Sequence, residues 1–335
     1  MYFPMSYIIF LFTLILSSII SISSSSWFGA WIGLELNMLS FVPLITLKMN
    51  SYYSEAALKY FLIQALGSSL FISSSFLSIM FFYISYIFIL LALLLKLGSA
   101  PFHFWFPQVM EGLNWPQIFL LMSIQKLAPM ILLSYLLINN FMTKLIILFA
   151  ILSAMVGALG GLNLLQLRKI LAFSSINHIS WMMIAILTGD IFWFIYFIIY
   201  MFILLSITSM FYNLQVFTFS SIIQSNQNSI LHSILISFNL LSLGGLPPFT
   251  GFIPKWMLIQ MMVNFNMYIP LFFLLVSALI TLYFYLRIII MFILLLNPIM
   301  NFNMKYKSIT LNFSMMMKTF FNFIGLLLPT YLLLF

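Results

Sequence analysis

Apolar stretches of about twenty residues recur along the whole 335-residue chain, separated by short polar or proline-containing interruptions. A helix of about 20 apolar residues spans the hydrocarbon core of a bilayer, so each stretch predicts one membrane helix. The pattern therefore predicts an all-α polytopic membrane protein with about eleven transmembrane helices. The expected ranges are 4–23, 27–47, 55–80, 84–107, 116–138, 144–162, 170–187, 190–213, 229–263, 268–296 and 314–334.

Two of these stretches, 84–107 and 229–263, are interrupted by glycine and proline. The first contains Leu-Gly-Ser-Ala-Pro from residue 97, and the second contains Leu-Gly-Gly-Leu-Pro-Pro from residue 243. Broken backbone is tolerated at membrane depth only where it faces protein or water, so both breaks are expected in the interior. Ordinary proline kinks are the alternative, because glycine and proline are frequent in membrane helices.

The broken stretches are the fourth and ninth predicted helices, and this spacing predicts an inverted repeat. Elements five helices apart cross the membrane in opposite senses, which is the antiporter-like arrangement that places a transported ion near the midplane. A single membrane domain is expected to cover residues 1–335, with repeat one at about 4–138 and repeat two at about 144–296. The helix at about 314–334 is then an extra C-terminal helix.

The composition agrees with a membrane protein and excludes several kinds of site. Hydrophobic residues make up 64% of the chain and charged residues only 5%, more apolar surface than a soluble core needs. Cysteine is absent, which excludes disulfides and thiolate or iron–sulfur ligation, and the three histidines lack metal-ligand spacing. The net charge of +8 is spread over loops without a basic patch, so no nucleic-acid partner is expected. The apolar N-terminus lacks a basic region and a cleavage site, so we expect it to be the first membrane helix.

Lysine and arginine fall mainly in loops that follow even-numbered helices, and this bias predicts the orientation. Such residues are enriched on the inner side of a membrane, which places the N-terminus inside and the C-terminus outside. The loop residues that carry the bias are Lys48, Arg168, Lys169, Lys305 and Lys307.

Four ionisable side chains lie deep within predicted helices: Glu35, Lys96, Lys126 and Lys255. Lys96 precedes the first break, Lys255 follows the second, and Lys126 is expected in the middle of the helix at 116–138. A charge at the centre of a membrane helix costs roughly 2.5–3.5 kcal/mol, so such residues suggest an ion pathway. Structural ion pairs and snorkelling side chains are the alternatives.

A proton relay follows from these residue types. Removal from water disfavours the charged form of a lysine, whereas a nearby carboxylate stabilises it. Movement of Glu35 relative to Lys96 would therefore switch that lysine between keeping and releasing its proton, and Lys126 and Lys255 could pass it on through ordered water. His178 is a candidate to bridge Lys126 and Lys255, with a hydrogen-bonded core histidine as the equal alternative. His103 could bond carbonyls freed by the first break.

Several motifs resemble those of the subunit 2 family of mitochondrial NADH:ubiquinone oxidoreductase, respiratory complex I, and the likeness runs through essentially the whole chain. The abundance of Met, Ile, Phe and Asn is typical of an AT-rich gene and resembles insect members. The motifs are KLGSAPFHFW at 96–105, QKLAP at 125–129, GGLN at 160–163, RKILAFSSINH at 168–178 and GGLPPFTGFIPKW at 244–256. The tail from about residue 297 departs most from the family.

The resemblance implies an antiporter-like proton-pumping subunit of the membrane arm in the mitochondrial inner membrane, with the N-terminus in the matrix and the C-terminus in the intermembrane space. Glu35 and Lys96 correspond to the family's glutamate–lysine pair, Lys126 to its central lysine and Lys255 to its terminal lysine. No cofactor is implied in this chain, since NADH, FMN, iron–sulfur clusters and ubiquinone would be used by other subunits. The implied partners are subunits 4L and 4 and the lipid bilayer, with cardiolipin as a candidate lipid. A stand-alone cation/proton antiporter and a scaffold without a proton path are the alternative functions.

Overall fold

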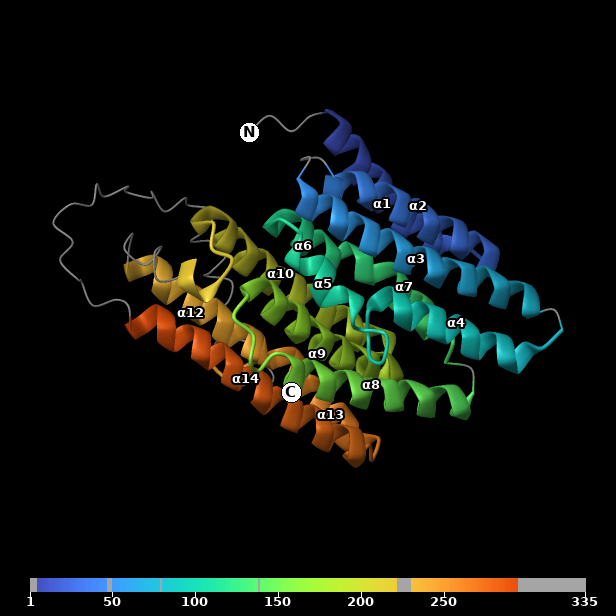
Figure 1. The fold of residues 1–335 in the computed structure, drawn as a ribbon. Coiled ribbons are helices and arrows are strands. Elements are labelled where there is room, and N and C mark those ends of the chain that lie inside the picture. Colours follow the sequence, from blue (N-terminus) through green and yellow to red (C-terminus); the bar gives the residue numbers. More distant parts are fainter. Residues whose placement is uncertain (1–4, 47–49, 79, 138, 222–229, 295–335) are drawn as a thin grey trace. The chain divides into compact units, whose positions relative to one another are not determined.

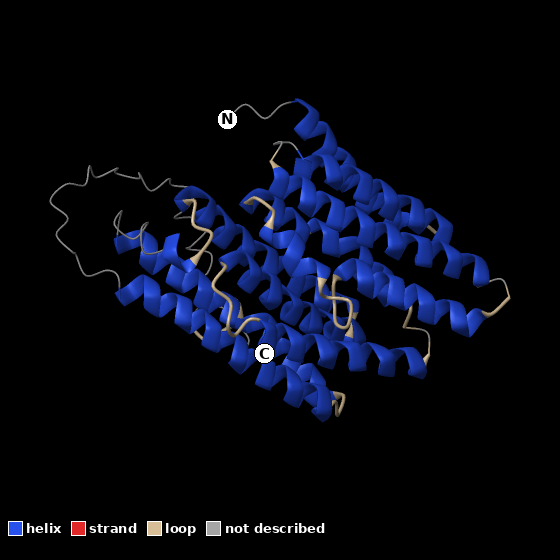
Figure 2. Cartoon of the chain, in the orientation of Figure 1, coloured by secondary structure: helices blue, strands red, loops and turns tan. Residues whose placement is uncertain are grey.

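The computed structural model describes residues 5–46, 50–78, 80–137, 139–221 and 230–294. Regular structure in these ranges is helical, as Figure 2 shows, apart from one isolated antiparallel bridge between Gln166 and Thr218. Eight of the described helical segments are long and apolar enough to cross a membrane. The chain divides into two compact units, Met1–Ser153 and Ala154–Phe335. It is therefore an all-helical membrane protein.

The first unit is built on a row of packed helices that can be followed in Figure 1. Helix α1 packs on α2, α2 on α3 and α3 on α4, while α7 packs on both α1 and α4. At Gly33 the backbones of α1 and α2 come so close that a Cβ there would lie 2.6 Å from the backbone nitrogen of Ser21. Small residues allow this approach between membrane helices. The helices are α1 (Met5–Ser23), α2 (Trp27–Thr46), α3 (Ser51–Leu77), α4 (Phe82–Leu97), α5 (Trp105–Glu111), α6 (Trp115–Met122) and α7 (Ile124–Ser134), followed by α8 (Asn140–Gly160), which ends in the second unit.

The second unit is organised around α9, which is buried along nearly its whole length and packs on α10, α13 and α14. Asn177 in α9 accepts a hydrogen bond at its side-chain oxygen from the Ser277 hydroxyl of α14 (3.0 Å). This polar contact fixes the register of two apolar helices. The helices are α9 (Leu167–Thr188), α10 (Asp190–Leu214), α12 (Ile230–Gly244), α13 (Phe252–Asn264) and α14 (Tyr268–Leu294).

Both predicted breaks are present in the structure. The first separates α4 from α5, and the second separates α12 from α13. Each contains a glycine in the left-handed region, Gly98 at φ +70° and Gly245 at φ +78°. Only glycine adopts this conformation without steric cost, so the glycines explain where the helices end.

The prediction of one continuous helix at 116–138 is wrong. The segment divides at Ser123, which has φ −112° and ψ −85°, into α6 and α7. The Ser123 hydroxyl donates to the Phe119 carbonyl (2.5 Å), a bond of the kind that bends helices, and Pro129 in the next turns has no N–H to donate. Lys126 consequently lies in the first turn of α7 and not in the middle of a helix. The predicted helix at 314–334 and the basic residues Lys48, Lys305 and Lys307 fall outside the described residues.

Candidate functional site

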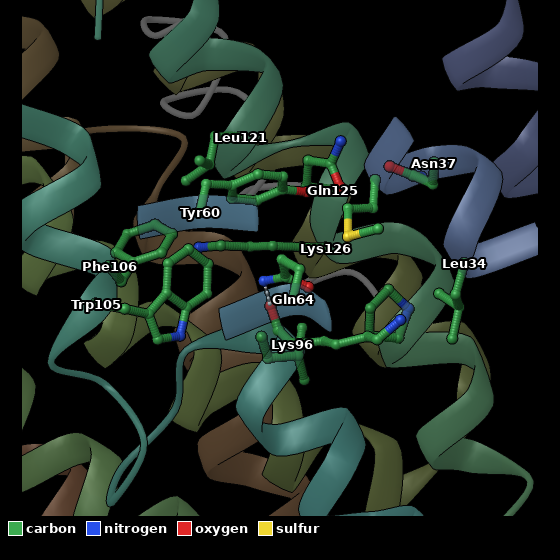
Figure 3. Close-up of a pocket in the computed structure, with 13 residues that line it drawn as sticks. Leu34, Asn37, Tyr60, Gln64, Lys96, Trp105, Phe106, Leu121, Gln125 and Lys126 are labelled. Carbon is green, nitrogen blue, oxygen red and sulfur yellow. Dashed lines mark hydrogen bonds between the residues drawn. The ribbon is translucent and has the colours of Figure 1, made fainter. Parts of the chain in front are cut away.

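Lys96 and Lys126 line one cavity in the first unit, although they are 30 positions apart in the sequence and come from α4 and α7. The cavity measures about 20 Å³, which is enough for a water molecule. The two lysines are only 7% and 2% exposed. Figure 3 shows that their ammonium groups point in opposite directions, so they do not contact each other directly. The polar residues lining the cavity are Asn37, Tyr60, Gln64, Lys96, Gln125 and Lys126.

The end of α4 is held in place around Lys96 by two side chains from other elements. Gln64 of α3 donates from Nε2 to the Lys96 carbonyl oxygen (3.3 Å). Trp105, the first residue of α5, donates from its indole N–H to the Leu95 carbonyl (3.1 Å). Because the last carbonyls of a helix lack partners within the helix, these bonds stabilise the broken backbone.

Glu35 of α2 is half-buried and close enough to Lys96 for their charges to interact. In the part of the chain that the structure describes, the two do not form a direct ion pair. Glu35 is also absent from the cavity wall, to which Leu34, Asn37 and Met38 of the same helix contribute. The carboxylate therefore acts on Lys96 from beside the cavity.

Two amide groups at this cavity have buried atoms without a hydrogen-bond partner among the described residues. They are the Asn37 side-chain oxygen and the Gln125 side-chain nitrogen. The Gln125 oxygen is satisfied, since it accepts a bond from the Tyr60 hydroxyl (3.2 Å). Buried polar atoms are normally paired with protein or with ordered water, so this wall favours a bound water between the two lysines.

Lys255 is held at the second break, in the second unit. It is 6% exposed, and its ammonium donates to the carbonyl oxygen of Gly244, the last residue of α12 (2.8 Å). It also lies 5.9 Å from the ring centroid of Trp181. A cation is stabilised at a helix C-terminus, where carbonyl groups are unpaired and the helix dipole is negative.

His178 lies on α9 in the same unit and contacts two tyrosines of α10. Its Nδ1 is 2.8 Å from the Tyr196 hydroxyl, and its ring lies 4.8 Å from the ring of Tyr200. It lines a second cavity of about 10 Å³ together with Gly251 and Pro254 of the second break. His178 is therefore both hydrogen-bonded and adjacent to the segment that carries Lys255.

The sequence-predicted residues thus form two groups, Lys96 with Lys126 and Glu35 in the first unit and His178 with Lys255 in the second. His103 of the first break hydrogen-bonds the Pro101 carbonyl through Nδ1 (3.2 Å). No group of three or more potential metal ligands occurs within the described ranges. Sequence reasoning missed the polar cavity residues Asn37, Tyr60, Gln64 and Gln125, whose signal is an uncharged polar group inside an apolar stretch.

Comparison with known proteins gives a consistent result. The family described as NADH:quinone oxidoreductase/Mrp antiporter, transmembrane, matches residues 24–84 and 72–281. NADH-ubiquinone oxidoreductase chain 2 of Anopheles gambiae is 46% identical over 91% of this chain and 93% of its own length. The Locusta migratoria protein of the same name is 36% identical over 91% of this chain and 90% of its own length.

Solved structures share the fold. A chain of respiratory complex I from Thermus thermophilus superposes with a TM-score of 0.79 at 22% identity, covering 98% of this chain and 80% of that one. A chain of the Mrp complex from Dietzia gives a TM-score of 0.71 at 15% identity, over 84% of this chain and 59% of that one. The identity and coverage of the insect relatives, together with the family match, show that this chain belongs to the NADH-ubiquinone oxidoreductase chain 2 family.

Proposed function

We propose that this chain translocates protons as an antiporter-like core subunit in the membrane arm of respiratory complex I, in the mitochondrial inner membrane. Electron transfer from NADH to ubiquinone takes place in other subunits, where the cofactors lie. The observation that carries the proposal is the pair of buried lysines from separate helices, Lys96 and Lys126, on one water-sized polar cavity. Buried ionisable groups inside a membrane protein mark proton relays by default.

The proposed relay begins with the charge of Glu35. When the carboxylate lies near Lys96 it stabilises the ammonium, and when it moves away the apolar surroundings favour release of the proton. An ordered water held by the amides of Asn37 and Gln125 would carry the proton to Lys126. His178 and Lys255 would continue the path in the second unit, where both adjoin the second break.

The architecture that we propose extends beyond the described helices. It comprises eleven transmembrane helices in two inverted repeats, about 4–138 and 144–296, with an extra helix at about 314–334. The distribution of basic loop residues supports an N-terminus in the matrix and a C-terminus in the intermembrane space. Other membrane-arm subunits are the partners, and we propose subunits 4L and 4 as the neighbours and cardiolipin as a bound lipid.

The test compares Lys126→Ala with wild type in vesicles that contain equal amounts of assembled complex. Both NADH-driven proton uptake and quinone reduction are expected to fall together, because the two processes are coupled. Lys144→Ala is the matched control, since this lysine is exposed on α8 and outside both cavities. Wild-type values of both activities in Lys126→Ala would contradict the relay.

A stand-alone cation/proton antiporter would share this fold, as the likeness to the Mrp complex illustrates. Fold alone does not determine function. Co-migration of the chain with NADH-oxidising activity on a native gel separates the two functions, because an antiporter would be stable and active by itself.

A further inference from the structure

We propose that Phe106, the second residue of α5, is a positioning residue that holds the ammonium group of Lys126 away from Lys96 in the resting protein. The inference rests on the proposed function, because a resting position matters only if Lys126 carries a proton. It assigns a role in proton transfer to an apolar side chain of the first break.

The contact between the two residues is a cation–π interaction. The Lys126 Nζ lies 5.4 Å from the centroid of the Phe106 ring, within the roughly 6 Å range of this attraction. Lys126 is 2% exposed and Phe106 only 1% exposed. Because water does not compete at such a buried site, the ring provides a stronger interaction than at a protein surface.

The broken helix is what brings the ring to this position. Gly98 adopts φ +70°, and a Cβ at this residue would lie 3.2 Å from both the Phe106 Cβ and the Trp105 ring. Glycine at the break therefore allows the two aromatic residues to fold back over the end of α4. The Trp105 indole is fixed by its bond to the Leu95 carbonyl and by an edge contact with Phe106, at 5.4 Å between ring centroids. Phe106 is consequently held rigidly.

Lys126 also needs external stabilisation of its charge. It lies in the first turn of α7, where the helix dipole is positive and disfavours a cation. Figure 3 shows its chain running from α7 toward Phe106, while the Lys96 chain runs the other way. A proton exchanged with Lys96 through the cavity therefore requires the Lys126 ammonium to leave the ring. Phe106 holds the charged lysine ready and separates the two steps of the relay.

The experiment measures NADH-driven proton uptake at equal assembly for Phe106→Leu, which removes the aromatic face and keeps a buried apolar side chain. Proton uptake is expected to fall by roughly 2- to 30-fold, the range set by the strength of a cation–π contact. Phe106→Tyr retains the aromatic face and is expected to restore most of the activity. Phe71→Leu is the matched control: Phe71 is fully buried and packs edge-on against Trp27 at 6.0 Å, with no part in the cavity.

Equal activity of Phe106→Leu and Phe71→Leu, or equal loss in Phe106→Leu and Phe106→Tyr, would overturn this inference. A density map of the assembled wild-type complex provides a measurement that does not depend on folding of a variant. The Lys126 ammonium is expected over the Phe106 ring at rest and displaced from it during turnover, and a position away from the ring in both states would also overturn it. Lys126→Ala belongs in the same series, because its wild-type activity would refute the proposed function itself. A loss in Lys126→Ala without any loss in Phe106→Leu would refute only the role of Phe106.

Discussion

The substitution Gly245→Ala is expected to displace Lys255 from the second break. Gly245 has φ +78°, and a Cβ at this position would lie 2.8 Å from the Lys255 Cδ and 3.0 Å from its Nζ. These atoms belong to a flexible side chain, so the lysine moves and the backbone does not. The hydrogen bond from Lys255 to the Gly244 carbonyl is then lost.

The magnitude follows from two terms. A left-handed conformation costs a residue with a Cβ about 1–2 kcal/mol, and a hydrogen bond from a charged donor contributes about 1.5–3 kcal/mol. Their sum, about 2.5–5 kcal/mol, is a large part of the roughly 5–15 kcal/mol that stabilises a typical protein. Loss of stability and loss of proton transfer are both expected in this variant.

The adjacent residue supplies the control. A Cβ at Gly244 would meet its nearest atom at 3.7 Å, an ordinary contact, and alanine favours a helix over glycine by about 1 kcal/mol. Thermal loss of assembled complex on native gels and NADH-driven proton uptake are measured for both variants. Gly245→Ala should lose assembly at a lower temperature and pump less, while Gly244→Ala behaves as wild type. Indistinguishable results for the two variants would refute the reasoning.

Two further substitutions test the packing that supports the site. Gly33→Ala forces α1 away from α2, because the new methyl would lie 2.6 Å from the Ser21 backbone nitrogen; a loss of about 1–3 kcal/mol is expected, seen as a lower temperature of disassembly, and an unchanged temperature would contradict the close approach. Asn177→Leu removes the bond from Ser277 between α9 and α14, which should cost about 0.6–2 kcal/mol. Urea-dependent loss of NADH-oxidising activity in the assembled complex checks this value, with Asn177→Ser as the variant expected to lose less.

The hydrophobic pattern predicted most of the helices well because a bilayer sets their length. The predicted ranges 27–47 and 190–213 compare with α2 at Trp27–Thr46 and α10 at Asp190–Leu214. Both breaks were also predictable, since glycine and proline together interrupt a helix. The break at Ser123 was not, because a serine inside an apolar stretch usually forms a local hydrogen bond without ending the helix.

Charges identified the lysines of the candidate site but not their surroundings. An intramembrane charge is costly and therefore conspicuous in a sequence, whereas Gln64 and Tyr60 could equally have faced a neighbouring helix or lipid. Which face of α3 meets α4 and α5 depends on packing among several helices, and periodicity along one helix does not determine it. The pairing of Lys96 with Lys126 on one cavity likewise required the arrangement of α4 against α7.

The two breaks solve the same electrostatic problem in different ways, and the difference bears on what each lysine can do. At the first break the carbonyl groups of Leu95 and Lys96 are satisfied by Trp105 and Gln64, so the Lys96 ammonium is not needed to stabilise the backbone. At the second break the Lys255 ammonium itself satisfies the end of α12. Release of a proton from Lys96 therefore leaves the helix end intact, whereas release from Lys255 weakens the bond that holds its break together. Proton loss at Lys255 should consequently be coupled to movement between α12 and α13, and proton loss at Lys96 to the position of Glu35.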